Sequence, residues 1–99
     1  MIELNKGSIE NVIVPVKDLL GALTTLVGTT PTFSVYKDDD SNTQVVNNQV
    51  ASVDVLEAHC LVDTTLSAFT IGQYRLYLKL VTSPETPVLG PVLFKVNSL

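Results

Sequence analysis

Residues 71–82 read Ile-Gly-Gln-Tyr-Arg-Leu-Tyr-Leu-Lys-Leu-Val-Thr, and apolar and polar side chains alternate along most of this stretch. Successive side chains of a β-strand point to opposite faces, so the pattern predicts a strand with one buried face and one wet face. The inward row is apolar and consists of Tyr74, Leu76, Leu78 and Leu80. The outward row mixes two cations with an aromatic ring and consists of Arg75, Tyr77 and Lys79. Such a row suits either solvated strand surface or a protein interface.

The rest of the chain continues in short alternating segments that are separated by turn residues. Residues 2–5, 33–36 and 92–97 alternate clearly. Residues 19–27 could form a helix, but they are too short and too rich in threonine for a stable one, which favours a turn and then a short strand at residues 22–27. Pro15 lacks a backbone donor, so its strand is expected at a sheet edge. The pair at residues 47–48, Asn-Asn, predicts a turn.

Seven or eight such strands without a period of 3.6 predict an all-β fold. We expect a single domain over residues 1–99, an immunoglobulin-like β-sandwich of seven to eight antiparallel strands, with a closed barrel as the alternative. Cys60 is the only cysteine, so no intrachain disulfide forms. The alternation registers predict one core that contains Phe33, Val35, Tyr74, Leu76, Leu78, Val92 and Phe94.

The composition limits the classes of partner. Hydrophobic residues make up 45% of the 99 residues and charged residues 16%, so we expect that a partner covers part of the surface. The net charge of -4 disfavours nucleic acid. No apolar run is long enough to cross a membrane and no signal peptide is recognised, which predicts no membrane partner and synthesis in a cytoplasm.

The acidic residues at 38–40 invite comparison with a calcium loop. Asp38, Asp40 and Asn42 stand at alternate positions, as the first ligands of such a loop do. Thr43 replaces the expected glycine, however, and Gln49 falls where a bidentate glutamate is required. The pattern is more typical of a solvated acidic turn, which leaves a fortuitous cation site or a contact with a basic neighbour as its functional interpretations.

Other combinations of reactive residues do not form a recognisable catalytic or metal site. His59 and Cys60 are adjacent, so on a strand they point to opposite faces and do not converge on one metal or substrate. We expect Cys60 to fill the core and His59 to face outward. Neither a pocket of paired carboxylates nor a glycine-rich phosphate loop is recognisable. The sequence therefore predicts a protein that is not an enzyme and that uses no cofactor or metal.

Four stretches carry a resemblance to a known class of protein. They are residues 2–8 (Ile-Glu-Leu-Asn-Lys-Gly-Ser), 31–39 (Pro-Thr-Phe-Ser-Val-Tyr-Lys-Asp-Asp), 72–80 (Gly-Gln-Tyr-Arg-Leu-Tyr-Leu-Lys-Leu) and 91–96 (Pro-Val-Leu-Phe-Lys-Val). Their order resembles that of the small immunoglobulin-like domains in virion proteins of tailed bacteriophages. The resemblance implies a non-enzymatic structural protein of the virion, made in the bacterial host cytoplasm, and a capsid decoration or head-associated protein in particular. A tail or baseplate module, or an adhesin-like domain that binds host-surface glycans, is the alternative.

This resemblance also implies partners, namely capsid or tail subunits and further copies of the chain. Three groups of residues are candidate partner contacts. The first is an N-terminal arm, residues 1–8, that leaves its own sheet and presents Ile2, Leu4 and Lys6. The second is the acidic tip, Asp38, Asp39 and Asp40, and the third is the outward row, Arg75, Tyr77 and Lys79.

Overall fold

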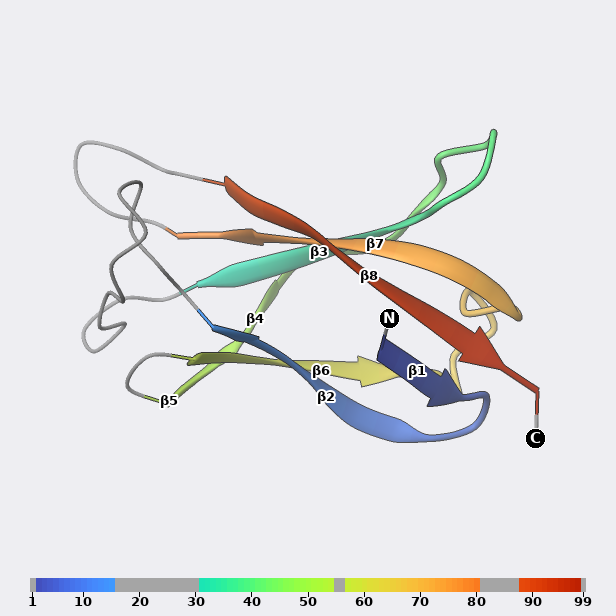
Figure 1. Ribbon diagram of the computed structural model, residues 1–99, viewed down its shortest axis with the longest axis horizontal. Coiled ribbons are helices and arrows are strands. Elements are labelled where there is room, and N and C mark those ends of the chain that lie inside the picture. Colours follow the sequence, from blue (N-terminus) through green and yellow to red (C-terminus); the bar gives the residue numbers. More distant parts are fainter. Residues whose placement is uncertain (1, 16–30, 55–56, 81–87, 99) are drawn as a thin grey trace.

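The computed structural model describes residues 2–15, 31–54, 57–80 and 88–98 (Figure 1). Their regular secondary structure consists of strands alone, which confirms the all-β prediction for these ranges. The strands are β1 (Ile2–Asn5), β2 (Ile9–Pro15), β3 (Thr32–Lys37), β4 (Gln44–Val50), β5 (Ser52–Asp54), β6 (Glu57–Asp63), β7 (Gly72–Lys79) and β8 (Val88–Asn97). The strand expected at residues 22–27 lies outside the described residues. Nowhere in the described ranges is there a helix with the length and hydropathy needed to span a membrane.

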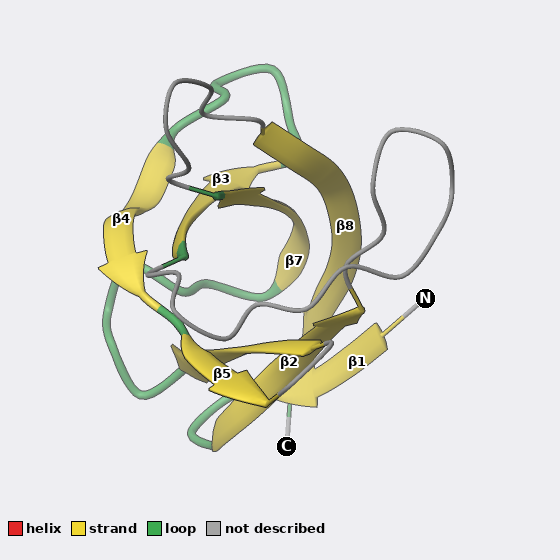
Figure 2. Cartoon of the chain, turned by 90° about the vertical axis from the view of Figure 1, so that its left-hand side faces the viewer, coloured by secondary structure: helices red, strands yellow, loops and turns green. Residues whose placement is uncertain are grey.

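The strands form two sheets. One has the order β1-β8-β7-β3-β4 and the other the order β2-β6-β5. Viewed along the long axis of the molecule, the strands of both sheets surround a common interior (Figure 2). Pro15 ends β2, which is an edge strand of the three-stranded sheet, so the edge position predicted for this proline is confirmed.

One strand pair corrects the prediction that all neighbours run antiparallel. β1 pairs with β8 in parallel, with Ile2 opposite Phe94 and Leu4 opposite Val96. The turn at residues 6–8 sends the chain from β1 into β2, which belongs to the other sheet. β1 therefore forms no hairpin with its successor, and it instead extends the sheet beside the last strand of the chain.

The Asn-Asn pair at residues 47–48 also differs from its predicted role. It lies inside β4 instead of forming a turn, and the register between β3 and β4 shifts along this stretch. Asn48 has a φ of 49°, a left-handed conformation that asparagine tolerates better than most residues. The pair therefore accommodates an irregularity within the strand. After β4 the chain passes to the other sheet at the buried Ala51, whose N–H donates to the carbonyl oxygen of Pro31 at 2.9 Å.

The core confirms most of the predicted registers. Six of the seven residues expected there are at most 1% exposed, and they are Phe33, Val35, Tyr74, Leu76, Leu78 and Phe94. Val92 is the exception, because it is only partly buried and packs against the edge of the core. The three-stranded sheet contributes Val12, Val14, Ala58, Cys60 and Val62 to the same cluster.

A cluster of three aromatic rings lies within this core. The rings of Tyr74 and Phe94 stack with centroids 5.3 Å apart, and Phe69 lies 5.3 Å from Tyr74. Phe69 comes from the loop between β6 and β7 and is fully buried. The sequence pattern gives no periodic signal for a loop residue of this kind, so its place in the core was not predicted.

Candidate functional site

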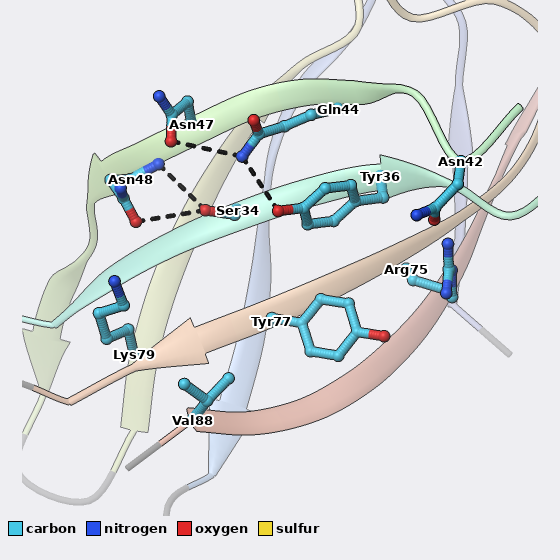
Figure 3. A pocket seen from close by; sticks show the side chains of 10 residues that line it. All are labelled: Ser34, Tyr36, Asn42, Gln44, Asn47, Asn48, Arg75, Tyr77, Lys79 and Val88. Atoms are coloured by element: carbon cyan, nitrogen blue, oxygen red, sulfur yellow. Dashed lines mark hydrogen bonds between the residues drawn. The ribbon is translucent and has the colours of Figure 1, made fainter. Parts of the chain in front are cut away.

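A polar groove lies on the outer face of the five-stranded sheet, above β3, β4 and β7 (Figure 3). Its volume is about 490 Å³, within the range of small-molecule sites. The described residues that line it are Ser34, Tyr36, Asn42, Gln44, Asn47, Asn48, Arg75, Tyr77, Lys79 and Val88. Most of these side chains carry hydroxyl, amide or cationic groups, so the groove is suited to a hydrogen-bonding ligand.

The outward row predicted from the sequence lies along this groove. Arg75, Tyr77 and Lys79 are half-buried, whereas the alternate residues of β7 are buried in the core. β3 runs alongside with Tyr36 opposite Arg75 and Ser34 opposite Tyr77. The rings of Tyr36 and Tyr77 meet edge to face with centroids 5.9 Å apart. Two strands thus place two tyrosines in the middle of the groove, with a cation toward each end (Figure 3).

A network of side-chain hydrogen bonds orders the β4 side of the groove. Nε2 of Gln44 donates to the hydroxyl of Tyr36 at 3.2 Å and to Oδ1 of Asn47 at 3.3 Å. The backbone N–H of Asn48 donates to Oγ of Ser34 at 3.1 Å. These bonds hold the polar side chains in place before any ligand arrives, which lowers the entropy lost on binding.

The acidic tip is connected to the groove through one ion pair. Nε of Arg75 lies 3.4 Å from Oδ1 of Asp38, and the N–H of Asp38 donates to the carbonyl of Gln73 at 2.9 Å. The structure therefore brings together a residue of the acidic tip and a residue of the outward row, which the sequence placed in separate surfaces.

Asp39 has a structural role within its own turn. Its Oδ1 accepts hydrogen bonds from the N–H groups of Ser41 at 2.9 Å and Asn42 at 3.3 Å. The hydroxyl of Ser41 also donates to it and is the largest cause that lowers the pKa of Asp39. Asp40 is exposed. Within the described ranges no three His, Cys, Asp or Glu side chains gather where they could hold a metal ion.

The N-terminal segment is packed against its own domain in this structure. Leu4 is only 4% exposed and belongs to the core, whereas Ile2 is exposed. Nζ of Lys6 donates to the carbonyl oxygens of Leu66 at 2.9 Å and Phe69 at 2.7 Å. Leu4 and Lys6 are thus engaged within the chain, and an arm that reaches a neighbour has to release both.

A buried threonine completes this attachment. Thr64 is fully buried, and its hydroxyl lies 2.8 Å from the carbonyl of Asn5 and 2.7 Å from that of Ser8. It accepts from the N–H of Ser8 at 2.9 Å. Sequence patterns do not indicate this contact, because it joins residues that are more than fifty positions apart.

A second surface was also missed by the sequence analysis. It is an apolar patch on the outer face of the three-stranded sheet, formed by Ile9, Ile13 and Leu61, which are 57%, 45% and 48% exposed. Asn11 faces Leu61 across the β2–β6 ladder, so Leu61 lies diagonal to both isoleucines. The available signal was that β2 carries aliphatic residues on both faces, since Val12 and Val14 fill its inner face.

His59 and Cys60 lie as the alternation predicted, with Cys60 in the core and His59 half-buried on the opposite face of β6. Burial raises the pKa of the Cys60 thiol to about 12. At neutral pH the thiol is therefore protonated and a poor nucleophile or metal ligand.

The sequence matches no protein-family model, and no curated protein matches it either.

Proposed function

We propose that this chain is a non-enzymatic structural protein of a tailed-bacteriophage virion, namely a capsid decoration or head-associated protein with an immunoglobulin-like fold. It packs against a capsid or tail subunit and stabilises the particle. Two observations support the fold, one supports the mode of contact, and the sequence resemblance supports the class of particle.

The strand order supports an immunoglobulin-like topology. In immunoglobulin domains the strands named C, F and G belong to one sheet and the strands named B, E and D to the other. Here β3, β7 and β8 are neighbours in the first sheet in the order expected for C, F and G, and β2, β6 and β5 have the order of B, E and D. β1 is not one of these six strands, and it pairs with β8, the last strand of the chain.

A hydrogen bond at the start of β7 supports the same topology. The hydroxyl of Tyr74 donates to the carbonyl oxygen of Thr70, four residues upstream, at 2.5 Å. Many immunoglobulin-like domains carry a tyrosine at this corner with the same bond back to the preceding loop. The ring of Tyr74 also stacks in the core, so one side chain fixes both the corner and the sheet packing.

The apolar patch is the observation that supports packing of this domain against a neighbouring subunit. Ile9, Ile13 and Leu61 are each about half exposed and lie together on one sheet face. A cluster of exposed apolar side chains indicates a site of protein association, because burial of the exposed half of each one contributes about 0.7 to 1.5 kcal/mol, half the value for complete burial. An exposed row of aliphatic side chains fits the apolar surface of a neighbouring subunit better than it fits a polar small ligand.

Particles assembled with variant chains test this proposal. Mass spectrometry of purified particles should detect the chain at a fixed copy number. The double variant Ile13→Asp, Leu61→Asp should fold, because both positions are exposed, but should be lost from the particles. The matched control is Lys79→Gln in the groove, which should be incorporated normally. Absence of the unmodified chain from the particles would reject the virion assignment, and full incorporation of the double variant would reject the patch as the contact.

A further inference from the structure

The groove differs in charge from the rest of the chain. The whole sequence has a net charge of -4, yet the described residues that line the groove include Arg75 and Lys79 and no aspartate or glutamate. Asp38 approaches Arg75 only on its Nε side. Nη2 of Arg75 donates to the carbonyl oxygen of Lys37 at 3.4 Å, and the guanidinium carries further N–H donors besides this one and Nε. The groove therefore favours a ligand that carries negative charge.

The cations are spaced along the groove and not clustered. Arg75 and Lys79 occupy the same face of β7 four residues apart, which corresponds to roughly 13 Å at the usual rise of a strand. Tyr77 lies between them, and Tyr36 lies beside it on β3 (Figure 3). An extended ligand along β7 thus meets charge at either end and aromatic rings in the middle.

The β4 side of the groove offers a high density of amide groups. Gln44, Asn47 and Asn48 stand beside the tyrosines. Gln44 uses its N–H donors on Tyr36 and Asn47, and Oδ1 of Asn48 accepts from the hydroxyl of Ser34 at 3.4 Å. Each amide side chain presents both donors and an acceptor. The hydroxyl groups of a sugar need both kinds of partner, and the C–H faces of a sugar ring pack on aromatic side chains.

A peptide ligand fits this groove less well. Peptides commonly bind sheets by pairing with a free edge strand. The floor of the groove is formed by β3 and β7, which are both paired on each side in the order β8-β7-β3-β4. Their backbone groups are used within the sheet, so recognition in the groove depends on side chains alone.

We propose that this groove binds an anionic saccharide along β7. Tyr36 and Tyr77 contact the sugar rings, the amides of β4 bind their hydroxyl groups, and Arg75 and Lys79 pair with carboxylate or phosphate groups. The groove and the apolar patch lie on the outer faces of different sheets. The domain can therefore bind a saccharide while its other face contacts a subunit, and the inference does not depend on the proposed virion role.

Titration of the isolated domain, followed by amide chemical shifts in NMR, tests the inference. The probes are oligogalacturonate, which carries carboxylates, and phosphomannan oligosaccharide, which carries phosphate. A neutral galactan oligosaccharide of matched length and polyglutamate are the comparison ligands. Shifts should concentrate in β3, β4 and β7 with at least one anionic saccharide, and the affinity should fall as salt is added because the charges lie at a solvent-open surface.

Two variants and one control complete the test. Tyr77→Ala and Lys79→Gln should each weaken the binding by about tenfold, the factor that corresponds to loss of one good contact. Ile13→Ser, on the other sheet, should bind as the unmodified chain does. Circular dichroism and the dispersion of the NMR spectrum establish that each variant is folded. The inference is overturned if neither anionic saccharide binds, if the neutral oligosaccharide or polyglutamate binds equally well, or if both folded groove variants retain full affinity.

Discussion

Nε of Arg75 lies 3.4 Å from Oδ1 of Asp38, so an ion pair joins the acidic tip to the outward row. The two side chains are 26% and 38% exposed, which leaves the Asp38 carboxylate open to water and salt, although Nε of Arg75 is itself buried. An exposed pair of this kind contributes little to folding. Its main effect is to neutralise part of the positive charge at one end of the groove.

Removal of the aspartate charge should therefore strengthen anion binding without a large change in stability. For Asp38→Asn we expect a change in the free energy of unfolding below about 1 kcal/mol. The affinity for oligogalacturonate should rise about two- to fivefold, which corresponds to the worth of one exposed ion pair. Chemical denaturation and NMR titration measure the two effects.

The matched control for this change is Asp40→Asn, which alters the net charge equally at an exposed position of the same loop. It should raise the affinity less than Asp38→Asn does, and high salt should remove the difference between the two. Equal gains in both variants would show that net charge, and not the contact with Arg75, controls binding.

A second prediction concerns the corner at the start of β7. Tyr74→Phe keeps the stacked ring but leaves the carbonyl oxygen of Thr70 without the hydroxyl donor. We expect a loss of about 0.5 to 1.5 kcal/mol in the free energy of unfolding, the usual net contribution of one hydrogen bond, because Thr70 is exposed and water can replace the lost donor. Tyr77→Phe in the groove is the control and should change stability by less than about 0.5 kcal/mol. Equal losses in the two variants would remove the corner bond as the cause.

Alternation was sufficient to predict the inner face of the main sheet. Phe33, Leu76 and Phe94 are buried as expected, because period-two patterning fixes which face of a strand meets the core. Such patterning does not encode which strands become neighbours. The parallel pairing of β1 with β8 and the passage of β4 through residues 47–48 therefore appeared only in the structure.

The candidate sites show the same difference between what one strand reveals and what depends on its neighbours. The outward row followed from alternation within one strand, but the groove also needs residues of β4 whose position depends on a shifted register with β3. The contact between Arg75 and Asp38 depends on how the loop after β3 folds back, which no periodicity describes. The aliphatic residues on both faces of β2 were visible in the sequence, but the apolar patch also needs Leu61 of β6, whose position beside them depends on the pairing of the two strands.

The thiol gives a third prediction. Burial raises the pKa of Cys60 from its ordinary value of 9.0 to about 12, so at pH 8 the folded protein should react with a thiol reagent far more slowly than the denatured chain. Ionisation favours the unfolded state once the pH exceeds 9. The stability of the protein should therefore fall relative to Cys60→Ala as the pH rises from 9 toward 12. Denaturation of both proteins across this range measures the difference.

A variant with an exposed thiol provides the control for the reagent. Cys60→Ala combined with Ser67→Cys places the only thiol in the exposed part of the loop between β6 and β7. This variant should react at pH 8 at nearly the same rate folded and denatured. Rapid modification of Cys60 in the folded protein would mean that β6 opens readily or that the thiol is not enclosed.

The last prediction decides whether the N-terminal segment is an integral strand or a removable arm. Leu4 is 4% exposed and lies opposite Val96, while Ile2 on the same strand is 37% exposed. If β1 is part of the isolated domain, Leu4→Ala should reduce the free energy of unfolding by about 2 to 5 kcal/mol, the range for a buried leucine. Ile2→Ala should cost clearly less than Leu4→Ala, because 37% of the Ile2 surface is already exposed to water, whereas Leu4 is almost fully buried. A small effect of Leu4→Ala in the isolated domain, together with loss of that variant from assembled particles, would instead show that residues 2–5 pack on a neighbour and would support the arm.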